Sequence, residues 1–78
     1  MCGKDMRDMD RMNASLDYIQ RTYDASAEYA THPMLGDADD ELYCTVVAKH
    51  HSYRVCIRAQ SVCYVRRESD DTVLLDAR

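Results

Sequence analysis

Residues 42–60 read LYCTVVAKHHSYRVCIRAQ, and this stretch decides the fold. Within it, residues 53–60 alternate at period two between mainly apolar and mainly polar side chains; the apolar set is Tyr53, Val55, Ile57 and Ala59. Successive side chains of a strand point to opposite faces of a sheet, so this alternation predicts a strand with one buried face. Residues 42–48 alternate similarly and are rich in β-branched and aromatic side chains, which predicts a neighbouring strand.

The sequence that follows extends the sheet. Residues 62–67 and 72–77 predict two further strands, because the segment Glu68-Ser69-Asp70-Asp71 between them has the composition of a turn. Helical spacing within residues 55–66 is a competing interpretation, and the β-branched content favours strands. Residues 42–77 are therefore predicted to form an antiparallel meander of three to four strands.

The N-terminal half predicts a long amphipathic helix. Apolar side chains recur there at spacings of three and four, as on one face of a helix; they are Met9, Met12, Leu16, Ile19 and Tyr23. Ala27 and Ala30 extend this stripe, and Pro33 disfavours helical geometry in the residue before it. We expect one α+β domain over residues 1–78, with a helix at about 6–31 packed on the sheet and an acidic loop at 32–41.

Composition restricts the class of protein. Leu, Ile and Val together account for only 13 of the 78 residues, and an interior this small often needs a partner. We therefore expect a homodimer formed through the Met9–Tyr23 stripe. No apolar run is long enough to span a membrane, and the charged start lacks the apolar core of a signal peptide. The expected location is the cytoplasm, or the host cytoplasm if a phage encodes the protein.

Charge is segregated along the chain, whose net charge is −4. Residues 1–41 carry a net charge of −6, residues 42–67 carry +5 with no acidic side chain, and residues 68–78 carry −3. The favoured interpretation is that an acidic element packs beside a basic one and the two neutralise each other. The alternative is that two faces of opposite sign each bind a macromolecule.

No pattern of catalytic residues stands out. The sequence holds no phosphate-binding loop, nucleophile elbow or dinucleotide fingerprint. The potential metal ligands are scattered and lack a close Cys-x-x-Cys pair; they are Cys44, His50, His51, Cys56 and Cys63. We therefore predict neither an enzyme nor a cofactor, and a structural metal-binding adaptor is the third hypothesis for function.

The leading hypothesis is a small acidic module that binds a larger protein or nucleoprotein complex. Its predicted contact surface combines carboxylates with two tyrosines: Asp17, Tyr18, Asp24, Glu28, Tyr29, Asp37, Asp39, Asp40 and Glu41. By analogy of size and charge, such a module would inhibit a nucleic-acid-handling complex, as anti-defence proteins of phages and mobile elements do, anti-CRISPR proteins among them.

The alternative hypothesis is an RNA- or DNA-binding module that uses a basic sheet face. The cations of that face would be Lys49, Arg54, Arg58, Arg66 and Arg67. Tyr43, Tyr53 and Tyr64 would offer rings on which bases stack. The low isoelectric point, about 5.1, argues against this hypothesis, because nucleic-acid-binding domains are typically basic.

Overall fold

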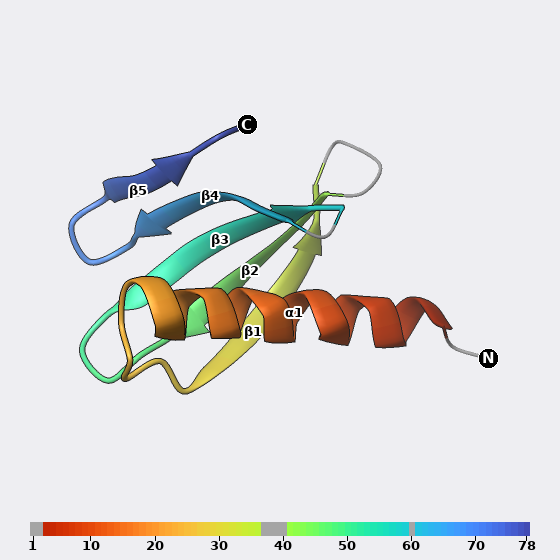
Figure 1. Ribbon diagram of the computed structural model, residues 1–78, viewed down its shortest axis with the longest axis horizontal. Coiled ribbons are helices and arrows are strands. Elements are labelled where there is room, and N and C mark those ends of the chain that lie inside the picture. The colour runs from red at the N-terminus through yellow and green to blue at the C-terminus, as the bar shows by residue number, and fades with distance from the viewer. Residues whose placement is uncertain (1–2, 37–40, 60) are drawn as a thin grey trace.

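The described residues of the chain form one helix and one sheet (Figure 1). The computed structural model describes residues 3–36, 41–59 and 61–78, with side chains from Met9 onward. Its elements are helix α1 (Gly3–Thr22) and strands β1 (Tyr29–Leu35), β2 (Glu41–Val47), β3 (Ser52–Arg58), β4 (Ser61–Arg67) and β5 (Thr72–Asp76). The strands pair antiparallel in the order β1-β2-β3-β4-β5. The predicted α+β fold is confirmed, and the sheet has five strands instead of three to four.

The additional strand is β1, and it lies where the sequence predicted the end of the helix and the start of a loop. The helix ends at Thr22 because Asp24 forms a tight turn, accepting hydrogen bonds from the Ser26 amide at 3.0 Å and the Ser26 hydroxyl at 2.6 Å. Pro33 fits in β1 because an edge strand can spare one amide donor. A left-handed His32, with φ of 55°, and a change of register after Thr31 accommodate it.

Helix α1 packs on one face of the sheet, across β1, β2 and β3 (Figure 1). Ile19 is fully buried there and joins a core that contains Cys44, Val46, Val55 and Val65. The apolar stripe of the helix is therefore used mainly inside the chain.

Only part of that stripe stays exposed. Met12 and Leu16 pack partly buried against the core, whereas Met9 is 62% exposed and Tyr23 36% exposed. The central side chains of the stripe contact the chain's own sheet, and its exposed ends are Met9 and Tyr23. A homodimer formed through this stripe stays a prediction.

The turn after the helix is anchored to the sheet by Asp24. The Tyr53 hydroxyl donates a hydrogen bond to Asp24 Oδ2 at 2.9 Å, and the Lys49 amide donates to Ser26 Oγ at 3.2 Å. Burial, together with the neighbouring Asp24 carboxylate, raises the pKa of Tyr53 to about 12. Asp24 thus joins the end of α1 to β3, and Ser26 joins it to the β2–β3 turn.

This anchor predicts a dependence of stability on pH. The hydrogen bonds that Asp24 accepts, chiefly from Ser26, lower its pKa below the ordinary value of 3.8. As the pH falls, Asp24 therefore takes up a proton in the unfolded state before it does so in the folded state. The contribution of Asp24 to stability is present above about pH 4 and is lost below it. We expect Asp24→Asn to lower the free energy of unfolding at pH 7. The difference in this free energy between variant and wild type should become smaller towards pH 3.

Urea denaturation of the wild type and of Asp24→Asn between pH 7 and pH 3 measures the difference in their free energy of unfolding. The stability of the variant should still depend on pH to some extent, because its Asp70 has a pKa that is lowered by pairing with Arg67. A gap that stays constant between pH 7 and pH 3 would show that Asp24 does not titrate as described.

Candidate functional site

The sheet face opposite α1 carries no helix in the described part of the chain, and we call it the open face. Cα partners in neighbouring antiparallel strands share a face, so the register gives the composition of this face row by row. One row crosses all five strands and has cations at its centre; it consists of Thr31, Thr45, Arg54, Arg66 and Val73. We call it the arginine row.

A second row on the open face lies beside the first and contains two aromatic rings. It consists of Met34, Tyr43, Cys56, Tyr64 and Asp76. Cys56 is fully buried and Tyr64 is 9% exposed, and together with Cys63 they form a small core against which Tyr43 packs. We call this second row the tyrosine row. Its central side chains pack against one another on the open face.

Arg54 and Arg66 are direct cross-strand partners, so two positively charged side chains extend from paired positions of β3 and β4. Such pairs destabilise a sheet when nothing lies between them. Arg54 contacts the Tyr43 ring, with Cζ 5.7 Å from its centroid. Arg66 lies 3.7 Å from Glu68, and its buried Nε has no hydrogen-bond partner among the described residues. Both guanidinium groups thus keep capacity to bind an anion.

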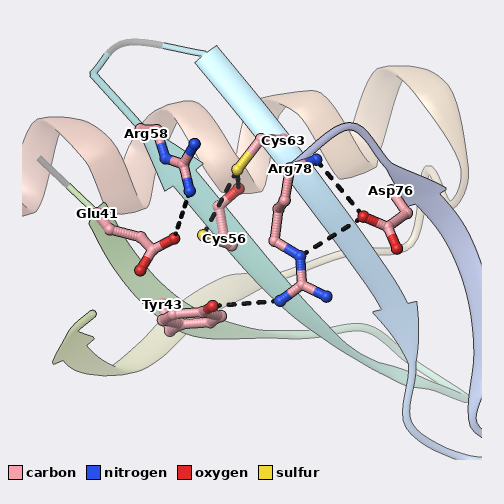
Figure 2. A network of polar contacts seen from close by, with 7 residues as sticks. All are labelled: Glu41, Tyr43, Cys56, Arg58, Cys63, Asp76 and Arg78. Carbon is pink, nitrogen blue, oxygen red and sulfur yellow. Dashed lines mark hydrogen bonds and ion pairs between the residues drawn. The ribbon is translucent and has the colours of Figure 1, made fainter. Parts of the chain in front are cut away.

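Arg78 adds a third cation, which lies beside Tyr43 (Figure 2) and over the ring of Tyr64. Its Cζ lies 4.0 Å from the centroid of the Tyr64 ring, and Nη1 donates to the Tyr43 hydroxyl at 3.4 Å. Nε lies 3.5 Å from Asp76 Oδ1. Arg78 is not among the cations predicted from the sequence, because it lies in the acidic segment 68–78 and only the pairing of β4 with β5 brings it to the open face.

The other cations of the predicted basic face do not join this group. Arg58 lies at the end of β3, where its Nη2 pairs with Glu41 at 3.0 Å (Figure 2). Arg67 is the Cα partner of Tyr53, on the helix side of the sheet, and pairs with Asp70 at 2.8 Å. Lys49 lies in the β2–β3 turn. Of the five predicted cations, the structure places Arg54 and Arg66 side by side.

The predicted acidic surface is divided by the fold. Asp37, Asp39 and Asp40 lie outside the described residues. Glu41 is only 6% exposed and pairs with Arg58, so its expected place on a solvated contact surface is corrected. Asp24 is held in the turn described above.

Four members of that predicted surface remain. Asp17 is exposed and pairs with Arg21 at 2.7 Å, and Glu28 and Tyr29 are exposed. Tyr18 is half-buried, with its ring 6.0 Å from that of Tyr23.

The potential metal ligands are spread over the molecule. Cys44 lies in the core under the helix, whereas Cys56 and Cys63 lie in the core of the open face. His50 and His51 line a shallow cleft with Ser69, where His51 Nδ1 is 3.0 Å from Ser69 Oγ. Within residues 3–36, 41–59 and 61–78, no group of three or more His, Cys, Asp and Glu side chains is placed to hold a metal ion.

Comparison with known proteins gave no match to a protein-family model, to a curated protein or to a solved structure. No helix in the described ranges is long and apolar enough to cross a membrane.

Proposed function

We propose that this chain is a non-catalytic binding module whose open face binds single-stranded nucleic acid. The observation that carries the proposal is the arginine row, in which Arg54 lies directly opposite Arg66 with no acidic side chain in the row. A phosphate between the two guanidinium groups would relieve their repulsion.

Nucleic acid fits this face better than a carboxylate-rich protein because the cations adjoin aromatic rings. Tyr43 is half-buried in the neighbouring row and contacts Arg54, so a base can stack on its ring while phosphates bind the nearby arginines. The hydroxyl groups of Thr31 and Thr45 can donate to phosphate oxygens in the same row.

The negative net charge does not contradict the proposal. Asp10 and Asp17 belong to α1, which packs on the other side of the sheet. Separated charge of this kind orients a polyanion towards the basic face during encounter.

The hypothesis of a protein-binding inhibitor, including one of the anti-CRISPR type, stays a prediction. Among the described residues its acidic surface is reduced to Asp17, Tyr18, Glu28 and Tyr29, of which Asp17 already pairs with Arg21. The experiment below separates the two hypotheses.

Fluorescence anisotropy with labelled single-stranded RNA and DNA oligonucleotides tests the proposal. With two to three phosphate contacts, the affinity should fall about tenfold between about 50 and 200 mM salt. Absence of binding at the lower salt concentration would overturn the proposal and leave protein binding as the better hypothesis.

A further inference from the structure

Two cysteines meet on the open face at an irregularity of the sheet. In the pairing of β3 with β4, Cys56 is opposite Tyr64 but Ile57 is opposite Val62, so Cys63 is the additional residue of a bulge. In a regular strand Cys63 would point away from the face that carries Tyr64. The bulge instead places Cys63 Sγ 3.5 Å from Cys56 Sγ and 3.5 Å from the Cys56 carbonyl oxygen (Figure 2).

This pair is set apart from the third described cysteine. Cys44 lies in the helix-side core, whereas Cys56 and Cys63 pack with Tyr64 and Tyr43. A disulfide bond is about 2.05 Å long, so the two sulfur atoms need to approach by only about 1.5 Å. Neighbouring strands already hold them in position, and little backbone movement is needed.

We propose that Cys56 and Cys63 form a modification site, at which a hydroperoxide converts the two thiols into a reversible intrachain disulfide. Cys63 reacts first because it is 8% exposed, whereas Cys56 has no exposed surface. Its sulfur, as thiolate, attacks one oxygen of hydrogen peroxide and displaces hydroxide, which gives a sulfenic acid. The hydroxide takes up the proton that the thiol released and forms one water. The sulfur of Cys56 then attacks that of Cys63 and releases the second water. The two sulfur atoms together lose two electrons, and the peroxide gains them.

The electrostatic environment supports this order of events. Burial, followed by the nearby Cys63, raises the pKa of the Cys56 thiol. Cys56 therefore stays protonated at neutral pH and acts as the resolving thiol, and the overall oxidation is slow and accelerates as the pH rises.

Mass spectrometry of the native protein tests the site. The reduced, folded chain is treated with hydrogen peroxide, its free thiols are alkylated after denaturation, and it is digested with trypsin. Cleavage after Arg54, Arg58 and Arg66 places Cys56 in peptide 55–58 and Cys63 in peptide 59–66. We expect these peptides to be recovered joined, with two alkylatable thiols lost per chain, and to separate on treatment with dithiothreitol.

Two variants and one comparison complete the experiment. Cys44→Ser should keep the joined peptides, and Cys63→Ser should abolish them. The same oxidation in denaturant should give mixed pairings among all four cysteines. Recovery of peptides 55–58 and 59–66 unjoined from the oxidised native wild-type chain, or joined to peptides containing Cys2 or Cys44, would overturn the proposal whether or not the variants fold.

Discussion

Arg54→Glu is expected to weaken binding of a single-stranded oligonucleotide by about tenfold or more while leaving the fold as stable as the wild type. The substitution removes one phosphate contact and places a carboxylate opposite Arg66, which then pairs within the protein. Because it also replaces a like-charge pair by an opposite-charge pair, the free energy of unfolding should be unchanged or raised by up to about 1 kcal/mol. Anisotropy titration and urea denaturation of the same preparation measure the two effects.

Arg21→Glu is the matched control, since it makes the same change in net charge on the helix. The Arg21 side chain is 75% exposed and pairs only with Asp17 among the ion pairs of the described residues. We expect its affinity for the oligonucleotide to stay within about twofold of wild type, because the charge lies away from the open face. Equal weakening by Arg21→Glu and Arg54→Glu would mean that net charge, not the arginine row, governs binding.

Ile19→Ala is expected to have the largest effect on stability. Among the side chains of α1 described from Met9 onward, Ile19 is the fully buried apolar one, and truncating such a side chain costs about 2–5 kcal/mol. A small domain has only about 5–15 kcal/mol of stability, so the melting temperature should fall by more than about 10 °C. Thermal unfolding followed by circular dichroism gives the shift.

Met9→Ala, at the exposed end of the same stripe, is the control for Ile19→Ala. Met9 is 62% exposed, and its truncation should change stability by less than about 0.5 kcal/mol. Equal effects of the two substitutions would contradict the packing of α1 on the sheet. A wild-type melting temperature that rises with protein concentration would show in addition that a second copy contributes to stability.

Much of the sheet could be predicted because its strands follow the period of two. Tyr53, Val55 and Ile57 alternate with polar residues, and turn residues separate β4 from β5. β1 could not be predicted in this way, because Ala27 and Ala30 continue the helical spacing by coincidence and Pro33 is typical of a helix end. The backbone pairing with β2 and the Asp24 turn outweighed that local pattern.

The site was only partly predictable, because it depends on register. Arg54 and Arg58 have the same parity in β3, but only the pairing with β2 shows that Arg58 faces Glu41. Arg66 and Arg67 are adjacent in sequence and lie on opposite faces, which alternation alone can assign once the strand is known. Arg78 reaches the open face through a strand pairing that no local pattern indicates.

One measurement tests the central claim, that the open face is the contact surface, most directly. It is the change in amide and arginine side-chain chemical shifts, by two-dimensional NMR, as an unlabelled single-stranded oligonucleotide is added. We predict shifts concentrated at Thr45, Arg54 and Arg66 and in the neighbouring Tyr43, with α1 largely unaffected. Shifts centred on Asp17 and Glu28 instead, or spread evenly over the molecule, would contradict the claim.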